Sequence, residues 1–532
     1  MSTFSRSRML LSTALRPFFA GLALCASLPA LAAAPTFDIY EYVIDGNSVL
    51  GEEIIENTMA PFLGEGKTLK DVDGARAALE DAYHKAGYLT VLVTIPEQGV
   101  DTGTVALHVT EGGVDKLRVV GAQYTLPSEI KAKVPELAEG NVPNFNKVQE
   151  QLNALNRNAD VKVTPILRAG TLPGTVEVQL DADDQLPLHG SVEYSNRQTP
   201  NTTASRLSAS LRYDNLFQRG QSLGLTIQTS PERSTDARVL AANYLIPVGS
   251  AGDAVTISGV HSRSEFASLA NAPGLGLLGN SDSLGLRYAT SLAAGIDYAH
   301  SLSAGLDHKR VGQDLLLSEG GGSSSLISYT PAVVSYSGRS FDAERNSGLD
   351  ATLTAGLRGL LGNHDDAFAA KRLGASASFM ALRTSVQHTE SLGHWSLIGK
   401  LDFQLASGPL VSNEQFSAGG AESVRGYREG ERTGDGGARI SVEVRTPQWR
   451  PGGVNSDWSW TGLAFFDAAR LHTQQVVAPQ PANENMRGTG LGMRMTAPRG
   501  LALEVDAARA LVDGDGTRSG DKRVHARAVW GF

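Results

Sequence analysis

The last two thirds of the sequence alternate between apolar and polar residues with a period of two. In Ala438–Arg445, alanine, isoleucine and valine occupy one face, while arginine, serine and glutamate occupy the other. That period is typical of a β-strand with one apolar side and one wet side. The same alternation recurs in Arg206–Asp214, Trp395–Leu405, Leu501–Asp506 and Val524–Phe532. Glycine supplies 58 of the 532 residues, above the usual share of roughly 7%, which fits many short strands and turns.

So many one-sided strands fit a closed transmembrane barrel. A lipid bilayer offers no water to backbone N–H and C=O groups, so strands can cross it only as a closed barrel. At about 22 residues per strand and connection, the stretch Leu188–Phe532 gives roughly 16 antiparallel strands. No stretch after residue 33 approaches the roughly 18 to 20 apolar residues of a membrane helix. A soluble β-solenoid could share the alternation, and the features below argue against it.

Residues 1–33 have the pattern of a secretory signal peptide. Basic residues come first, an apolar core runs from Phe18 to Leu28, and Ala30-Leu31-Ala32 forms a cleavage site. The only cysteine, Cys25, lies inside this segment, and the residue before it is too large for a lipoprotein signal. The mature chain therefore has no thiol. This excludes disulfides and cysteine catalysis and suits an exported protein.

The charge distribution argues against a nucleic-acid partner. The formal net charge is -9, charged residues make up 19% of the chain, and no basic tract stands out. Nucleic-acid binding normally requires a concentrated basic patch.

Residues 36–183 show one order of elements twice, which predicts two small α+β domains at 36–112 and 113–183. The first copy reads as strand Glu41–Gly46, helices Leu50–Leu63 and Leu69–Ala86, and strands Leu89–Ile95 and Thr104–Val109. The second reads as strand Leu117–Gly121, helices Pro127–Val134 and Phe145–Leu155, and strands Asp160–Leu167 and Thr175–Asp181. A glycine follows the first strand in both copies, at Gly46 and Gly121, which supports an internal repeat.

Within the predicted barrel domain, residues 184–532, the segment 414–437 is a long glycine-punctuated loop. It is too polar for lipid and too long for a simple hairpin, and such loops usually have a function or are disordered. Its centre reads Val424-Arg425-Gly426-Tyr427.

This loop closely resembles the loop signature of the POTRA-bearing outer-membrane barrels. It is most similar to that of the two-partner secretion transporters, the TpsB or ShlB/FhaC/HecB-type family of haemolysin and haemagglutinin exporters. In that family the loop folds back into the barrel lumen, and its arginine pairs with an aspartate on the inner wall. The family's aspartate motif is matched by Gly462–Ala469, which contains Phe465 and Asp467. The resemblance implies that Arg425 pairs with Asp467.

Two further segments carry the same resemblance. The order of elements in each small domain resembles a POTRA domain, which in this family lies in the periplasm and receives client polypeptides by adding a strand to a sheet edge. The terminal Trp530-Gly531-Phe532 resembles the signal read by the barrel-assembly machinery. Family members often carry an N-terminal plug helix, which we do not expect here because only a few residues separate the cleavage site from Phe37.

The enzyme-like patterns in the sequence fail on inspection. Gly64–Thr68 looks like the tail of a phosphate loop, but the leading glycine is replaced by Pro61, and we expect the segment to connect two helices. Gly274–Gly279 matches G-x-G-x-x-G only by letter, in a loop between strands. Asp513–Gly516 reads as a hairpin turn. We therefore predict no catalytic residues, no metal and no cofactor.

The sequence thus predicts an outer-membrane pore that exports a large partner exoprotein from the periplasm to the cell surface. Its other expected partners are outer-membrane lipid and, during biogenesis, the assembly machinery. The nearest alternative is a barrel-assembly factor of the same superfamily, which would carry more POTRA domains than two. A passive porin or adhesin would not need POTRA domains, and an enzyme barrel would need a nucleophile–base set that we do not find.

Overall fold

The computed structural model describes residues 36–532, except 101, 157, 173, 201, 250–251, 269–275, 293–294, 296, 317–321, 454–455 and 477–480. The predicted signal peptide lies outside the described residues. Contacts divide the described residues into two compact units. The first comprises the described part of Met1–Arg118 with Val134–Ala154 and Thr164–Leu180, and the second comprises Val119–Lys133, Leu155–Val163 and Asp181–Phe532. No helix in the described part of the chain is long and apolar enough to span a bilayer.

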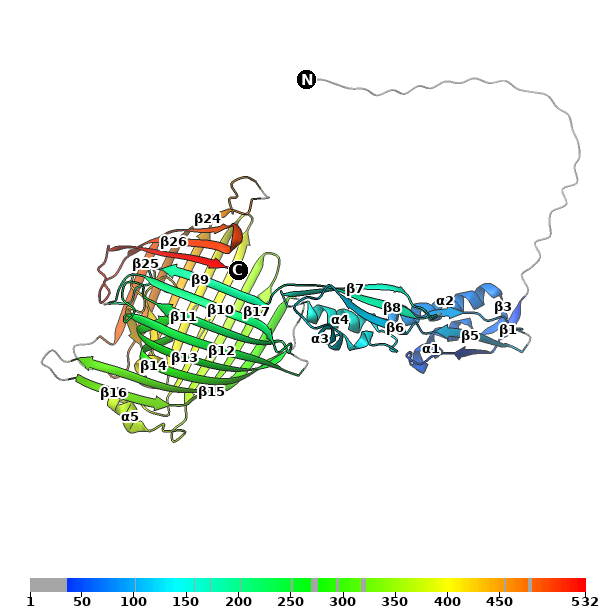
Figure 1. The fold of residues 1–532 in the computed structure, drawn as a ribbon, viewed down its shortest axis with the longest axis horizontal. Coiled ribbons are helices and arrows are strands. Elements are labelled where there is room, and N and C mark those ends of the chain that lie inside the picture. The colour runs from blue at the N-terminus through cyan, green and yellow to red at the C-terminus, as the bar shows by residue number, and fades with distance from the viewer. Residues whose placement is uncertain are drawn as a thin grey trace, which may run out of the picture. The chain divides into compact units, whose positions relative to one another are not determined.

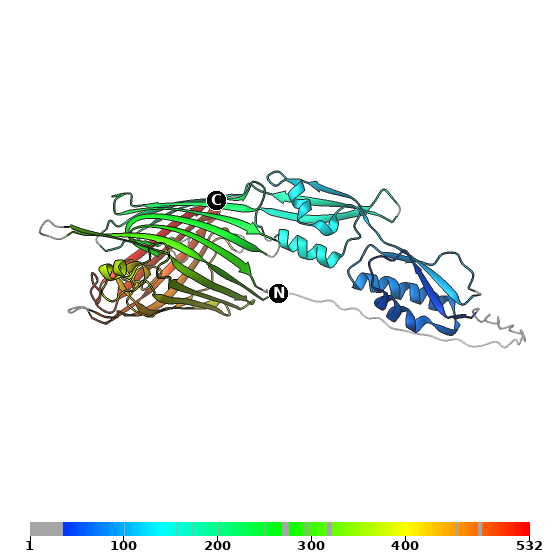
Figure 2. The ribbon, with the colours of Figure 1, turned by 90° about the horizontal axis from the view of Figure 1, so that it is seen from below.

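The first α+β module packs two helices on one face of a three-stranded sheet (Figure 2). The sheet order is β2-β5-β4, with β2 (Glu41–Asp45) parallel to β5 (Thr104–Thr110) and β4 (Leu92–Thr94) antiparallel to it. The helices are α1 (Glu52–Met59), continued by a 3-10 turn at Ala60–Phe62, and α2 (Leu69–Lys85). Thr68 and Asp71 form a capping box that starts α2.

The core of this module is apolar with one buried phenol. Leu79, Val91 and Leu107 are fully buried, and so is Tyr83, whose hydroxyl donates to Asn47 Oδ1 at 2.6 Å. Burial, and next the charge of Glu111, raise the pKa of Tyr83 to about 12. The phenol therefore stays a neutral donor at physiological pH.

Gly64–Thr68 connects the two helices, as the sequence predicts, but Gly64–Lys67 also form a strand that the sequence does not predict. This strand, β3, pairs with β1 (Phe37–Ile39). The short β1–β3 ladder escaped prediction because neither segment alternates for long enough to show a period.

The second module repeats the order of the first. Its sheet is β6-β8-β7, built from Val114–Val120, Val176–Asp184 and Val161–Ala169. Its helices are α3 (Pro127–Ala132), followed by a 3-10 turn at Pro135–Leu137, and α4 (Phe145–Leu155). Gly46 and Gly121 both have positive φ, at 87° and 89°. A Cβ on either glycine would overlap a backbone carbonyl oxygen, that of Val109 or Ala182. The two glycines therefore make the same close approach, which supports the internal repeat.

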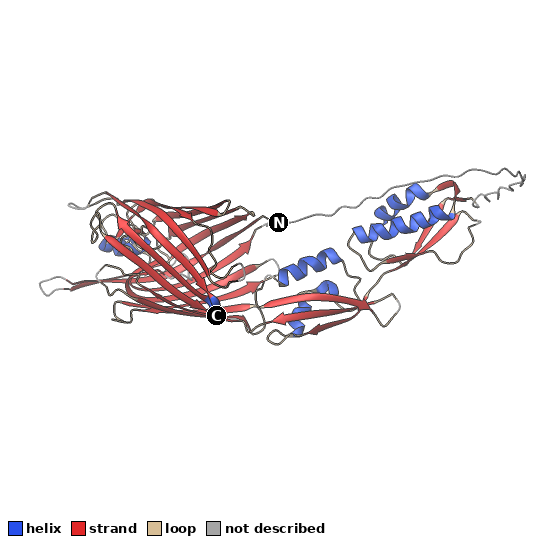
Figure 3. Cartoon of the chain, turned by 90° about the horizontal axis from the view of Figure 1, so that it is seen from above, coloured by secondary structure: helices blue, strands red, loops and turns tan. Residues whose placement is uncertain are grey.

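Apart from the two short strands β21 (Phe416–Ala418) and β22 (Arg432–Gly434), the remaining strands close on themselves as one antiparallel barrel (Figures 1 and 3). β16 and β17 are two parts of one strand, interrupted at Thr330 and both paired with β15, so the described residues form sixteen strands. This confirms the predicted fold class. The strands are β9 (Leu188–Ser195), β10 (Arg206–Leu216), β11 (Gln221–Thr229), β12 (Ala237–Val248), β13 (Asp253–Ser268), β14 (Gly276–Ser291), β15 (Tyr298–Leu316), β16 (Gly322–Tyr329), β17 (Pro331–Phe341), β18 (Arg345–Gly356), β19 (Met380–Leu392), β20 (Trp395–Ala406), β23 (Gly436–Arg445), β24 (Ser459–His472), β25 (Asn483–Ala497), β26 (Leu501–Ala510) and β27 (Lys522–Gly531).

The faces of the barrel strands follow the sequence alternation. On β23, Ile440, Val442 and Val444 are exposed on the outer face, whereas on β24 the side chain of Asp467 is fully buried. The barrel is closed by antiparallel pairing of β27 with β9. At the end of this seam, the backbones of Gly190 and Phe532 exchange two hydrogen bonds, each 3.0 Å long.

A short helix between β18 and β19 was not expected from the sequence. α5 (Asp365–Lys371) buries Phe368 against Tyr329 of the barrel wall, with ring centroids 5.3 Å apart. Phe379, Leu410 and Val411 belong to the same buried cluster. The cluster therefore joins two connections of the barrel to its wall.

The paired glycines of the small modules lead to a first prediction. Gly46→Ala and Gly121→Ala should each destabilise their own module by about 1 to 3 kcal/mol, because alanine is strained at positive φ and its Cβ would meet backbone. Gly113→Ala is the control, since its Cβ would make only an ordinary contact at 3.7 Å with a carbonyl oxygen. Peptide-resolved hydrogen exchange of the full chain measures each module separately. Equal protection in all three variants would contradict the prediction.

Candidate functional site

The loop between β20 and β23 is folded against the inner face of the barrel. It contains a 3-10 turn at Ser412–Glu414 and a small hairpin of β21 (Phe416–Ala418) and β22 (Arg432–Gly434). β23 begins at Gly436, so the predicted loop 414–437 ends two residues too late. The segment around Arg425 contacts inward-facing residues of β23, β24, β26 and β27, which are Glu443, Asp467, Asp506 and His525. A segment that touches all these inner faces lies in the lumen.

The guanidinium of Arg425 forms a bidentate ion pair with the carboxylate of Asp467. Nε donates to Oδ2 at 2.7 Å and Nη2 donates to Oδ1 at 2.8 Å, while the backbone N–H of Arg425 adds a third bond to Oδ2 at 3.1 Å. Arg425 is 3% exposed and Asp467 is 0% exposed. Removing one partner of such a buried pair leaves an uncompensated charge and typically costs about 3 to 5 kcal/mol.

The rest of the guanidinium is also occupied. Nη1 donates to Glu443 Oε1 at 2.7 Å, and Nη2 donates to Ser441 Oγ at 3.2 Å. The guanidinium carbon lies 3.4 Å from the centroid of the Phe465 ring. A flat, five-donor cation can meet all these partners at once, whereas a lysine ammonium is a point charge. Phe465 therefore acts as a stacking surface for the arginine, next to its carboxylate partner.

The residues beside Arg425 fix the backbone against the wall. The N–H of Gly426 donates to His525 Nε2 at 3.0 Å, and its φ of 103° favours glycine. The hydroxyl of Tyr427 donates to the carbonyl oxygen of Val512 at 2.6 Å. Val424 and Tyr427 are fully buried in one apolar cluster. All four residues of the predicted loop motif thus contact the wall or the loops above it.

Two further charged anchors hold the base of the loop, and sequence reasoning missed both. Asp435 is fully buried and forms a two-point ion pair with Arg372, just after α5, with Nη2 to Oδ2 at 2.7 Å. Glu414 accepts from Lys309 at 2.7 Å and from the hydroxyl of Tyr329 at 2.6 Å. The partners lie far apart in the chain and share no motif, so the sequence alone gave no signal for these pairs.

A polar cavity of about 490 Å³ lies beside the loop. Its charged lining mixes both signs and comes from the wall strands, the loop itself and the connection after β9: Arg197, Glu422, Arg425, Glu443, Arg445, Arg494, Glu504, Asp506 and Arg527. This part of the lumen therefore carries charges of both signs.

The predicted C-terminal signal residues lie on the outer face. Trp530 is 46% exposed and Phe532 is 59% exposed, and their ring centroids are 5.3 Å apart. Trp530 belongs to β27, the strand that closes the barrel, and Phe532 follows directly after its end.

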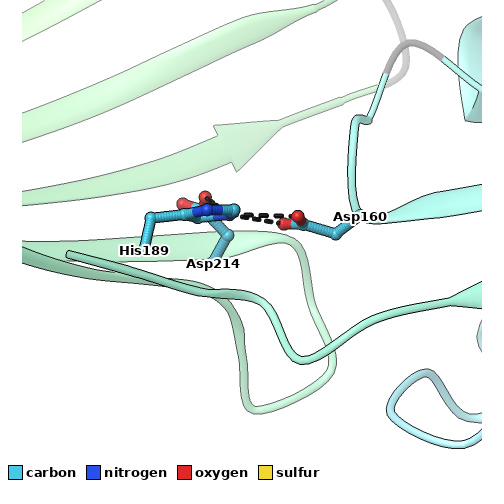
Figure 4. A group of neighbouring side chains, drawn as sticks. All are labelled: Asp160, His189 and Asp214. Atoms are coloured by element: carbon cyan, nitrogen blue, oxygen red, sulfur yellow. Dashed lines mark hydrogen bonds and ion pairs between the residues drawn. The ribbon is translucent and has the colours of Figure 1, made fainter. Parts of the chain in front are cut away.

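A second polar cluster, not predicted from the sequence, lies within the second unit (Figure 4). His189 on β9 and Asp214 on β10 face Asp160, which precedes β7; His189 Nε2 is 3.0 Å from Asp160 and 3.6 Å from Asp214. The three ligand atoms lie within 4.8 Å of one another. The contacts of the His189 imidazole with the two carboxylates account for this geometry, so we assign it no metal.

Comparisons with known proteins now identify the family. A model described as haemolysin secretion/activation protein ShlB/FhaC/HecB matches residues 174–495, more than half of the chain. The chain belongs to this family. A second model, described as POTRA domain, ShlB-type, matches residues 37–112.

Similar proteins include two named transporters. The outer membrane transporter CdiB of Dickeya dadantii is 24% identical over 421 residues, 78% of this chain and 73% of the relative. The heme/hemopexin transporter protein HuxB of Haemophilus influenzae is 21% identical over 488 residues, 88% of this chain and 82% of the relative.

Among solved structures, CdiB from Escherichia coli matches with a TM-score of 0.63 at 21% identity, covering 95% of this chain and 92% of that one. BamA from Haemophilus ducreyi, lacking POTRA domains 1–3, matches with a TM-score of 0.55 at 14% identity, covering 94% and 100%. At these identities the structural likeness shows the fold alone.

Family membership establishes the general role. The chain is a two-partner secretion transporter of the outer membrane and not an enzyme, with the POTRA region in the periplasm. Because β9 follows that region, the barrel end where β9 starts is periplasmic. The connection that holds Arg425 therefore leaves the wall at the opposite, cell-surface end before it folds inward.

The close approach of the loop to the wall can be tested without removing a charge. A Cβ at Gly488 would overlap the carbonyl oxygen of Arg425, so Gly488→Ala should displace the loop and cost about 1 to 3 kcal/mol. We expect a lower unfolding temperature and faster hydrogen exchange in residues 415–435. Gly399→Ala, with nothing within 4 Å of its Cβ, is the matched wall variant and should change neither. A Gly488→Ala variant that behaves like Gly399→Ala would show that the loop does not rest on this strand.

Proposed function

We propose that this chain exports one large partner exoprotein, of the haemolysin, haemagglutinin or adhesin type, from the periplasm to the cell surface. The match to the ShlB/FhaC/HecB family over residues 174–495 carries the proposal. We propose a signal peptide at 1–33, POTRA domains at 36–112 and 113–183, and the barrel at 184–532. Folding of the client outside the cell would supply the drive, and no nucleotide is hydrolysed.

In this proposal, the Val424–Tyr427 loop is the element that sets the state of the pore. Its support is the number of buried contacts that one guanidinium makes: a carboxylate fork, a second acid and an aromatic face. These contacts support a loop that is held in one position against the inner wall. Trp530 and Phe532 serve as the signal for the barrel-assembly machinery, and the apolar outer face of the strands meets outer-membrane lipid.

Client docking is proposed on the outer edge of β2 in the first POTRA domain. The opposite edge of that sheet is partly blocked, because Glu80 accepts the N–H of Val93 on β4 at 3.1 Å. In the second domain, the side-chain amide of Asn156 accepts the N–H of Val163 on the β7 edge and donates to its C=O, so this edge is capped as well. Among the described residues, no side chain caps the backbone of Glu41–Asp45 in this way. An uncapped strand edge is the surface that strand addition requires.

The export proposal is tested first by deletion. Loss of this chain should abolish release of one large exoprotein into the medium while other outer-membrane barrels keep their normal levels. A general loss of barrels would instead favour an assembly factor of the same superfamily. This experiment also identifies the client used below.

The arginine fork leads to a prediction about export. Arg425→Lys and Asp467→Asn should each reduce release of the client about tenfold or more, because either change breaks a buried, two-point ion pair. Arg345→Lys is the control, since Arg345 is 63% exposed in its pair with Glu390. Heat-modifiable migration on gels verifies that each barrel assembles. If both variants assemble and still release the client at the wild-type level, the ion pair of the loop has no role in export.

The docking edge leads to a separate prediction. A photo-crosslinking residue at Val43, on the uncapped β2 edge, should capture the client in the periplasm. The same residue at Leu92, on the capped β4 edge, should not, although Leu92 is the more exposed of the two at 56% against 44%. Stronger capture at Leu92 would assign docking to the other edge.

A further inference from the structure

The outer face of β12–β15 carries a cationic patch near the cell-surface end of the barrel. In the strand register, Arg238 lies directly opposite Arg263, and one step nearer the periplasm His261 lies opposite Asp282, which lies opposite Arg310. The alternate residues of the same strands, Val239, Ser262, Ser281 and Val311, are 5% exposed or less and face inward. The five polar residues of the patch, Arg238, His261, Arg263, Asp282 and Arg310, are exposed and therefore face outward.

An apolar band begins directly below this patch. Two register steps beneath the His261–Asp282–Arg310 row, Ile257, Leu286 and Leu306 lie opposite one another and are 41%, 56% and 42% exposed. Each step spans two residues, or about 6.7 Å. The patch thus lies just above the hydrocarbon-facing band, at the level of lipid headgroups.

The three arginines of the patch lack a partner within the described part of the chain. The side chains of Arg238, Arg263 and Arg310 make no ion pair or hydrogen bond with any residue that the structure describes. Asp282 is the one acidic residue of the patch, and its Oδ1 lies in hydrogen-bond contact with His261 Nδ1 at 2.6 Å. Like charges directly opposite each other on a sheet are destabilising, so the Arg238–Arg263 pair needs an external anion to offset it.

The shape beside the arginines fits an amphiphilic anion. A shallow hollow of about 360 Å³ is lined by Leu240, His261, Asp282, Leu284, His308 and Arg310. Leu240 and Leu284 are 50% and 59% exposed, so the hollow combines exposed apolar side chains with the guanidinium of Arg310. Guanidinium groups bind phosphate in two-point geometry. A soluble anion would leave the leucines in contact with water, whereas a lipid covers both parts.

We propose that this patch binds the phosphorylated headgroup of a lipid in the outer leaflet of the membrane, with Arg238, Arg263 and Arg310 on the phosphates and an acyl chain along Leu240 and Leu284. The site lies on the lipid side of the wall, away from the lumen. It follows from the outer-membrane location and does not depend on which protein is exported.

The experiment measures lipid binding by the purified full chain in detergent, with no client present. Diphosphoryl lipid A is the probe, and native mass spectrometry measures its binding. The double variant Arg238→Glu and Arg263→Glu should bind it about tenfold more weakly than the wild type, because two charge-assisted contacts become repulsive. Arg310→Gln should weaken binding by a smaller factor. Arg219→Glu, an exposed arginine in the turn after β10, is the matched charge reversal and should have no effect.

Three results would overturn the proposal. The first is equal binding of lipid A by the double variant and by Arg219→Glu. The second is equal binding of a dephosphorylated lipid A, which would assign the contact to acyl chains alone. The third is full competition by millimolar inorganic phosphate without any acyl chain, which would indicate a soluble anion. Heat-modifiable migration verifies folding, and Arg310→Gln keeps the test valid should the double variant fail to assemble. A failure here leaves the export proposal intact, because no client enters the assay.

Discussion

Backbone hydrogen bonding at the β9–β27 seam is the constraint on which the barrel depends. In hydrocarbon, each unpaired N–H or C=O group costs several kcal/mol, so the first and last strands must meet. Their ladder runs only from Arg527–Ser195 to Gly531–Ser191. Side-chain and terminal groups extend it at both ends. Asn196 pairs through its amide with the backbones of Val524 and Ala526, and Phe532 pairs with Gly190. The C-terminal aromatic residue is therefore part of the closure itself.

A closed barrel with an apolar exterior leaves its polar residues inside, and those residues hold the loop. Three buried acids secure it, at its base through Glu414 and Asp435 and at its tip through Asp467. Each has its own cation, from β15, from the connection after α5, and from the loop itself. A buried ion pair gains little against hydrated charges, but breaking one partner away is expensive. Three buried ion pairs thus hold the loop in one position, and separating any of them is costly as long as the charges stay buried. Hydration of these charges would lower that cost.

The sequence predicted what repeats and what alternates. Period-two alternation places Ile440, Val442 and Val444 on one face of β23, and they do lie on the outer face. The order of elements identified both α+β modules, and α4 has the predicted bounds Phe145–Leu155. Family likeness brought Arg425 and Asp467 together, although no spacing in the sequence relates them.

The features that the sequence does not predict are either very short elements or contacts between residues that lie far apart in the chain. The β1–β3 ladder uses segments too short to show a period, and Gly64–Lys67 contain two glycines, which ordinarily weaken a strand. α5 is only seven residues long and is held by the packing of Phe368 on Tyr329, a contact between distant parts of the chain. The Arg372–Asp435 pair likewise joins two neighbouring connections of the barrel. Such features arise from tertiary packing, which overrides local propensity.

The identity of each loop-motif residue follows from what lies across from it on the wall. Arginine is required at 425 because one planar group must serve Asp467, Glu443 and the Phe465 ring together. Glycine is required at 426 because its N–H reaches His525 at a φ that other residues resist. Tyrosine at 427 fills a fully buried space, and its hydroxyl donates to the carbonyl oxygen of Val512 and accepts the N–H of Arg487. The loop motif therefore contacts five neighbouring wall strands, β23 to β27. Because each residue of the motif must fit its own partner on the wall, this short stretch of sequence carries much information about the fold.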